Sequence, residues 1–155
     1  MGLTPDSIAQ PGAEPSLWQY DPSRIVAVWN GLILSGYADG TFIDIERRKP
    51  AFEIYVGTTG AAARCRTRDD TAKATITLLA QAPVNELLIV MAYDDANDWQ
   101  GVSPFKLKDL NGSIVAFAVE AWPVKVPKVT RSKQADVMVW EFAMSDFDVI
   151  ATPGQ

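Results

Sequence analysis

The first informative absence from this chain is histidine. Its 155 residues include no histidine and one cysteine, Cys65. Without histidine the chain cannot form a Ser-His or Cys-His catalytic pair or a histidine-containing zinc site. One cysteine excludes a disulfide within the chain and is typical of a reducing compartment. Because Cys65 stands in an extended segment between two arginines that point to the other face, we interpret it as an inert small residue.

Long apolar runs are also missing. Runs such as residues 87–93 are far shorter than the roughly 18 residues that a membrane span needs. The first residues show no basic region before an apolar stretch, so we expect no signal peptide. There is no phosphate-binding glycine loop, nucleophile elbow or paired-cysteine site, and the carboxylates of 94–98 lack calcium-loop spacing. We therefore expect no catalytic residue, no metal and no cofactor.

Positive charge is in the minority. The net charge is −5, with 48% hydrophobic and 21% charged residues. This composition is typical of a globular protein with one core. An acidic balance argues against a general nucleic-acid binder, because affinity for phosphates comes mainly from clustered lysine and arginine.

The chain divides into an arm, one domain and a short tail. Residues 1–22 carry four prolines and little periodicity, which predicts an extended arm before a domain at 23–150 and a tail at 151–155. Trp18 and Tyr20 are unusual in a solvated arm. Either they cover the surface of their own domain, or they dock on a neighbouring subunit.

Period-two alternation predicts a mainly β domain of about seven to eight strands. Asn30-Gly31 and Asn111-Gly112 are hairpin-turn signals. Helical spacing appears at 83–97, with Asn85 as the expected N-cap and fraying expected at Asp94 and Asp95. The pattern favours a small β-barrel or sandwich with one helix packed on it. The predicted strands lie at 24–29, 32–36, 41–46, 51–57, 73–80, 104–122 (as a hairpin) and 135–149.

Two charged stretches suggest contact with a partner. The first is a basic turn before Pro50, and the second is a run of arginines at a spacing of two, which an extended backbone places on one side. Three interpretations stay open for both: a solvated loop, a nucleic-acid patch, or a charge-complementary contact with another copy of the chain. The residues are Glu46, Arg47, Arg48 and Lys49 in the turn, and Arg64, Arg66, Arg68, Asp69 and Asp70 in the run.

One predicted strand, 114–122, is apolar on both faces. Such a strand favours cover on both sides, and open sheet edges invite pairing. A ring that joins the sheet of one subunit to the next would satisfy both requirements, so we predict a ring-closing strand here. Its first face carries Ile114, Ala116, Ala118 and Trp122, and its second carries Val115, Phe117 and Val119.

The order of these features resembles the tail tube proteins of tailed bacteriophages, in particular small structural proteins of phages with contractile tails. The resemblance covers about residues 36–149. It runs through Ala-Asp-Gly-Thr-Phe (38–42), Glu-Arg (46–47), Val-Gly (56–57), Arg-x-Arg-x-x-Asp (64–69), a threonine-leucine strand, a short helix after Pro-x-Asn (83–85), "FKLKDLNG" and "EAW".

The resemblance implies a fold shared with the tube proteins of type VI secretion and contractile bacteriocins. Subunits of such proteins close their sheets into a hexameric β-barrel ring, with the helix outside, and the rings stack into a hollow tube. The implied partners are other copies of the chain and sheath, baseplate and terminator proteins. DNA would pass through the lumen without specific binding, and the protein would reside in the virion tail, after assembly in the host cytoplasm.

Three alternatives remain at this stage. One is a tube protein of a secretion system or bacteriocin that passes no DNA. Another is a monomeric β-barrel module that binds a small ligand or oligosaccharide. A hydrolase with paired carboxylates is a third, although no spacing in the sequence supports one.

Overall fold

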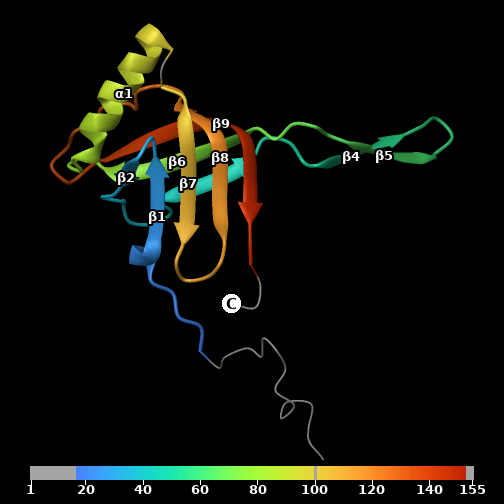
Figure 1. Cartoon of the computed structure of the whole chain (residues 1–155), viewed down its shortest axis with the longest axis horizontal. Coiled ribbons are helices and arrows are strands. Elements are labelled where there is room, and N and C mark those ends of the chain that lie inside the picture. Colours follow the sequence, from blue (N-terminus) through green and yellow to red (C-terminus); the bar gives the residue numbers. More distant parts are fainter. Residues whose placement is uncertain (1–16, 100, 153–155) are drawn as a thin grey trace, which may run out of the picture.

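Seven strands form one antiparallel sheet, in the order β2-β1-β7-β8-β9-β6-β3 (Figure 1). The structure is a computed structural model that describes residues 17–99 and 101–152. Within these residues a separate two-stranded sheet, β4–β5, and one α-helix complete the fold. The elements are η1 (Pro22–Arg24), β1 (Ile25–Trp29), β2 (Leu32–Leu34), β3 (Ile43–Arg47), β4 (Phe52–Val56), β5 (Ala62–Arg66), β6 (Ala72–Leu79), α1 (Val84–Asp98), β7 (Ser103–Asp109), β8 (Val115–Pro123) and β9 (Val137–Ile150).

The long strand β9 joins two layers of the sheet. Its first part pairs with β6, from Val137 opposite Leu79 to Met144 opposite Ala72, and its later part pairs with β8. Asp146 has left-handed backbone (φ 50°), so the strand departs from regular geometry beyond the point where it leaves β6. As Figure 1 shows, β1, β7 and β8 therefore cross over β3 and β6. Such crossed layers are typical of orthogonal sheet packing, where one strand makes the corner.

The core lies between these layers and is rich in aromatic residues. Trp29 and Phe142 meet edge to face with ring centroids 5.2 Å apart, and Phe105 packs on Phe142 at 5.9 Å. Trp29 Nε1 donates to the carbonyl of Ala121 at 3.0 Å, so its polar atom is satisfied although its side chain is fully buried. The inward alternation of β6, where Ala72, Ala74, Ile76 and Leu78 are buried, places this strand as predicted.

The predicted hairpin turns are confirmed. Asn30 and Gly31 have φ of 53° and 75° between β1 and β2, the geometry that a type I′ turn requires. The chain also turns at Asn111-Gly112 between β7 and β8. The basic turn, by contrast, does not join two paired strands, because β3 pairs with β6 whereas β4 pairs with β5.

Helix α1 confirms the predicted helix but corrects its two ends. Asn85 is wrong as the N-cap, because Pro83 occupies that position without a side-chain cap. Asn85 is instead buried: its Nδ2 donates to the Leu79 carbonyl at 2.8 Å, and its Oδ1 accepts from Trp140 Nε1 at 2.9 Å. Fraying was expected at Asp94 and Asp95, but the helix continues through both residues to Asp98.

The sheet of a single chain is open, although its ends approach each other. Tyr37 forms an isolated bridge with Leu78, and the segment around it bonds to the end of β6 through Leu79 N to Gly36 O (2.8 Å) and Ala38 N to Thr77 O (3.1 Å). The mainly β fold with one helix is thus as predicted, whereas the hexameric ring barrel stays a prediction.

Candidate assembly interface

A two-stranded hairpin projects from the domain. β4 and β5 pair with each other from Phe52 opposite Arg66 to Val56 opposite Ala62, and they extend well beyond the main sheet (Figure 1). Every residue of both strands is exposed. The tip is closed by hydrogen bonds from Gly57 N to Ala61 O (2.8 Å) and Gly60 N to Gly57 O (3.0 Å). The strands predicted from the sequence did not include β5.

One face of the hairpin combines apolar and cationic side chains. Cross-strand pairing places Phe52, Ile54 and Val56 on the same face as Arg64 and Arg66. The Arg64 guanidinium lies 3.6 Å from the centre of the Phe52 ring, a cation–π contact. Ile54 is 75% exposed.

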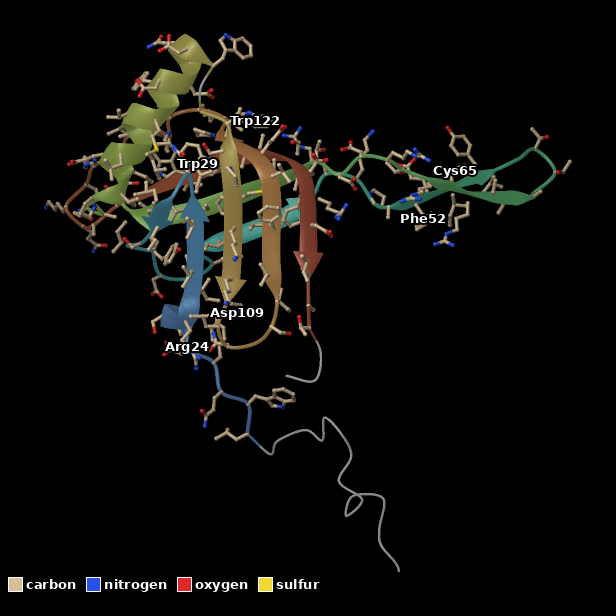
Figure 2. All side chains as sticks on the ribbon, in the orientation of Figure 1. Arg24, Trp29, Phe52, Cys65, Asp109 and Trp122 are labelled. Atoms are coloured by element: carbon tan, nitrogen blue, oxygen red, sulfur yellow. The ribbon has the colours of Figure 1, made fainter. Side chains whose placement is uncertain are left out.

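The opposite face carries Glu53, Tyr55, Ala63 and Cys65, and Figure 2 shows Phe52 and Cys65 on the projecting hairpin. Tyr55 and Val56, at the end of β4, are 68% and 67% exposed. A two-stranded hairpin in water is only marginally stable. A contiguous exposed apolar surface marks an interaction site more often than a solvated loop.

The base of the hairpin is fixed within the chain. Arg47 forms ion pairs with Asp70 (2.9 Å) and Asp148 (3.5 Å), and its guanidinium lies 5.8 Å from the Phe147 ring. Arg48 N donates to Thr71 O at 3.0 Å. Because these side chains are largely exposed, each ion pair is worth only about 0–1 kcal/mol.

Asp69 shapes the turn that follows the hairpin. Its Oδ1 accepts hydrogen bonds from the hydroxyl and the backbone N–H of Thr71, which hold the pKa of Asp69 below its usual range. Asp69, Asp70 and Arg47 thus have structural partners in their own chain.

The remaining residues of the two charged stretches are free of such pairs within the described residues. Arg64 and Arg66 share a face of β5, as their spacing predicts, whereas Arg68 lies beyond the end of the strand. Glu46, Arg48 and Lys49 are exposed beside the hairpin base. A contact between subunits through these charges stays a prediction.

The strand predicted to close the ring lies in the middle of the sheet. β7 and β9 occupy the two edges of β8, so β8 has no free main chain for another subunit. Ala116 and Ala118 are buried, whereas Ile114 is 54% exposed just before the strand and Trp122 is half-buried near its end. The free edges of the sheet belong to β2 and β3. A contact of β8 with another subunit would therefore have to be made by the side chains that this strand exposes, and not by its main chain.

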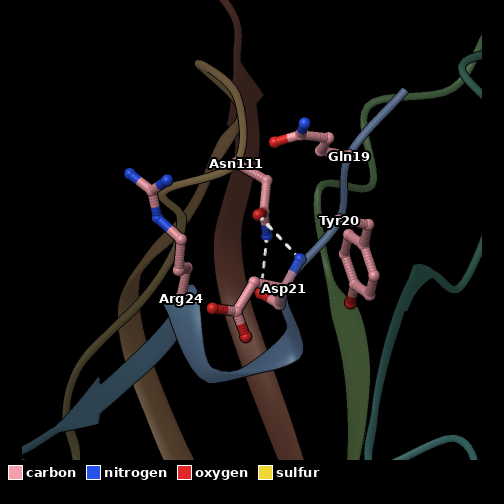
Figure 3. Close-up of a pocket in the computed structure, with 5 residues that line it drawn as sticks. All are labelled: Gln19, Tyr20, Asp21, Arg24 and Asn111. Carbon is pink, nitrogen blue, oxygen red and sulfur yellow. Dashed lines mark hydrogen bonds between the residues drawn. The ribbon is translucent and has the colours of Figure 1, made fainter. Parts of the chain in front are cut away.

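Asn111 fastens the arm to the turn between β7 and β8. Asp21 N donates to Asn111 Oδ1 (3.0 Å), and Asn111 Nδ2 donates back to Asp21 O (2.9 Å); Figure 3 shows both bonds. The Asp21 side chain caps η1, and the hydrogen bonds from the hydroxyl and backbone N–H of Ser23 lower the pKa of its carboxyl. These residues line an open surface depression together with Gln19, Tyr20 and Arg24.

Trp18 and Tyr20 remain largely exposed in a single chain. Their side chains are 72% and 65% exposed, which disfavours the first of the two interpretations of the arm. Docking of these rings on a neighbouring subunit stays a prediction. Residues 1–16 of the predicted arm lie outside the described residues.

The described part of the chain has no group of three or more histidine, cysteine, aspartate or glutamate side chains placed to hold a metal ion. None of its helices is long and apolar enough to cross a membrane.

The fold belongs to a known structural class. No family model matches the chain. Three solved structures share the fold and align over most of this chain. The first is the tube-terminating cap of the anti-feeding prophage, with a TM-score of 0.55 and 12% identity over 90% of this chain and 97% of that chain. The second is the sheath/tube terminator of the extracellular contractile injection system PVC, with a TM-score of 0.56 and 14% identity over 88% of this chain and 100% of that chain. The third is a chain of the PVC sheath-tube complex, with a TM-score of 0.55 and 13% identity over 97% of this chain and 100% of that chain.

One curated protein is similar in sequence. The chain is 24% identical over 135 residues to Structural protein ORF10 of Pseudomonas phage KPP10, which covers 82% of this chain and 78% of that protein. These comparisons confirm the prediction of a non-enzymatic protein with the fold of tube-associated components of contractile systems.

Proposed function

We propose that this chain is a ring-forming structural subunit of the tail tube assembly of a contractile phage tail. In this proposal copies of the chain associate side by side into a hexameric ring, and the ring stacks on a tube that carries DNA without binding it specifically. The further partners are sheath, baseplate and terminator proteins. The similarity to a phage structural protein and the fold shared with contractile injection systems support this assignment.

The exposed apolar hairpin is the observation that carries the proposal. β4 presents Phe52, Ile54, Tyr55 and Val56 to solvent at 45–75% exposure, and no element other than β5 packs against it within the described residues. A monomeric protein gains nothing from such a surface and is exposed to aggregation. A subunit of a large assembly, in contrast, can bury it against its neighbour.

A second position in the assembly is the end of the tube. Two of the three solved structures named above are described as a tube-terminating cap and a sheath/tube terminator. A tube subunit must stack through both faces of its ring, whereas a terminator stacks through one. A purified tube subunit should therefore form stacks of many rings, whereas a purified terminator should stop at a single ring or a pair of rings.

The test combines microscopy with one hairpin variant. Ile54→Glu places a charge on the exposed apolar face of β4, so we expect rings or tubes to disappear in negative-stain microscopy and sedimentation velocity. The thermal unfolding midpoint should stay unchanged, because Ile54 packs against no part of the core. Leu110→Ser, at an exposed aliphatic residue in the turn between β7 and β8, is the control.

The outcomes separate the candidates. Long tubes from the natural chain support a tube subunit, and isolated rings support a terminator. A natural chain that stays monomeric, also in the presence of preformed tubes, would contradict the proposal and favour a binding module. Unchanged assembly of Ile54→Glu would remove the hairpin as its basis.

A further inference from the structure

The connection between β8 and β9 is the most basic segment of the described chain. Residues 124–135, called here the basic loop, make up all of this connection except Asp136 and contain four cations and no acidic residue. All four are exposed, and the ion pairs among the described residues involve Arg47 and Lys73 instead. Arg131 donates only to the neighbouring Thr130 carbonyl (2.8 Å). The cations are Lys125, Lys128, Arg131 and Lys133.

Helix α1 carries the opposite charge. It contains Glu86, Asp94, Asp95 and Asp98 and no basic residue. Three of these carboxylates lie in its C-terminal half, where the helix dipole is already negative and favours a cation. The described residues supply none, since the last turn has no basic side chain and none of the carboxylates forms an ion pair.

Within a single chain only the start of the basic loop lies against helix α1. The basic loop first passes the C-terminal half of the helix, where Trp122–Val126 line a shallow groove with Ala92, Tyr93, Asp95 and Ala96, and Lys125 forms no ion pair with Asp95. Its far part then lies beside the N-terminal end of α1, at the end opposite to Asp94 and Asp98 (Figure 1). At 1.5 Å per residue, the 15-residue helix separates its two ends by about 20 Å.

Both surfaces also carry exposed apolar side chains. Val124 and Val129 of the basic loop are 51% and 63% exposed, and Leu87, Val90 and Tyr93 of the helix are 50–58% exposed. Apolar area surrounded by charge is the usual composition of a protein–protein contact. A solvated salt-bridge surface would not need it.

We propose that the basic loop of one copy binds the acidic, solvent-facing side of helix α1 of a second copy. The contact is heterologous: each subunit offers its loop to one neighbour and its helix to the other, and repetition of such a contact closes a ring. The inference rests on the proposed self-assembly and adds which surfaces meet in it. Complementary charge also suppresses wrong pairing, because loop against loop and helix against helix repel.

A second copy fits these observations better than a nucleic acid does. A polyanion would neutralise the loop but would leave the carboxylates of α1 uncompensated at the negative end of the helix. It would also meet a chain of net charge −5, which lowers the affinity for phosphates. A second copy neutralises both surfaces at once.

The test is a charge exchange. The loop variant is Lys128→Glu with Arg131→Glu, and the helix variant is Asp94→Lys with Asp98→Lys, which spares Asp95 because its carboxylate accepts from Gly101 N (2.9 Å). Each variant should weaken self-association about tenfold or more in sedimentation velocity, from exposed pairs of modest individual strength. The variant with all four changes should restore association. Lys106→Glu with Lys108→Glu, which reverses two lysines of β7, is the control for net charge.

Salt and DNA complete the design. At about 1 M salt the Debye length falls to about 3 Å, so association of the natural chain should weaken toward that of the loop variant. Binding of a double-stranded DNA fragment is measured in parallel. Thermal unfolding of each variant shows whether it is folded.

The results that overturn the inference are distinct from those that overturn the proposed function. If Ile54→Glu abolishes rings but the loop variant assembles normally, the function stands and the inference fails. If the loop variant and the helix variant both self-associate weakly and the variant with all four changes self-associates no better than either, the two surfaces do not meet. If the loop variant loses DNA binding while its self-association is unchanged, the loop is a nucleic-acid contact instead.

Discussion

The buried hydrogen-bond chain from Leu79 through Asn85 to Trp140 should be a major contributor to stability. Asn85 is 3% exposed and Trp140 is fully buried. Replacing Asn85 by Leu, which has a similar volume, leaves Trp140 Nε1 without a partner. An unsatisfied buried donor costs about 1–3 kcal/mol, and the lost bond to Leu79 adds about 0.5–1.5 kcal/mol. The Leu79 carbonyl itself keeps a partner, because Ala82 N also donates to it at 3.0 Å. We therefore expect Asn85→Leu to lower the free energy of unfolding by about 2–4 kcal/mol.

A double-mutant cycle isolates the Asn85–Trp140 bond from the other consequences. Trp140→Phe removes the indole N–H and leaves Asn85 Oδ1 unsatisfied, in addition to the loss of packing volume. When both residues are apolar, neither polar group remains. The loss of unfolding free energy in the double variant should therefore be smaller than the sum of the two single losses by about 1–3 kcal/mol. The volume loss at Trp140 is common to both sides of the cycle and cancels.

Urea unfolding, followed by circular dichroism, gives the required free energies. The comparison is valid if the dependence on urea is the same in all four proteins, which shows that the surface exposed on unfolding has not changed. Losses that add within about 0.3 kcal/mol would refute the coupling. So would an Asn85→Leu protein that loses less than about 1 kcal/mol.

Two further predictions concern the connection after β2 and the turn after the hairpin. Gly36→Ala should destabilise the fold by at least about 1–2 kcal/mol in the same urea assay. The reason is that Gly36 has φ +78° and that an added Cβ would meet Ala82 Cβ at 2.4 Å. Gly112→Ala is the control and should be neutral, because no atom lies within 4 Å of the new Cβ. The pKa of Asp69, measured by carboxyl NMR, should lie below 3.8. Because the pKa is lowered in the folded protein, the contribution of Asp69 to stability is present above the pKa of the unfolded chain and is lost as the pH falls through the pKa of the folded protein. Thr71→Val should return the pKa of Asp69 toward 3.8, and an unchanged pKa would contradict the proposed cause.

Local signals were read correctly from the sequence where one short pattern decides the backbone. Asn30-Gly31 requires positive φ at two successive positions, and few alternatives satisfy that requirement. β6 alternates buried and outward residues over its whole length, so its pattern has one interpretation. β5 was missed because Ala62–Arg66 contains no β-branched and no large apolar residue, although the spacing of its arginines indicated an extended backbone. Its pairing with β4 comes from the register, which no local preference reports.

The role of Asn85 shows a different limit. Its position near the helix start matches the statistics of capping residues, and nothing local indicates that its amide joins Leu79 to a tryptophan 55 positions away. The same holds for the hairpin base, where the charges of Arg47 and Asp70 were identified but their pairing across 23 positions was not. Nor does alternation reveal that the apolar residues of β4 stay exposed, because a strand that awaits a partner and a half-buried strand have the same pattern.

The separation of the hairpin from the core has a consequence for how this protein can diverge. Substitutions in β4 and β5 touch no buried cluster of the main sheet, so they carry little of the folding penalty that most substitutions impose. In the proposed assembly, drift in this segment is limited by the matching surface on the neighbouring subunit rather than by the stability of its own domain. Related chains can change the hairpin together with the surface that it contacts, while the main sheet stays constant. Exchange of the hairpin alone is then a route by which assemblies built on one fold become mutually incompatible.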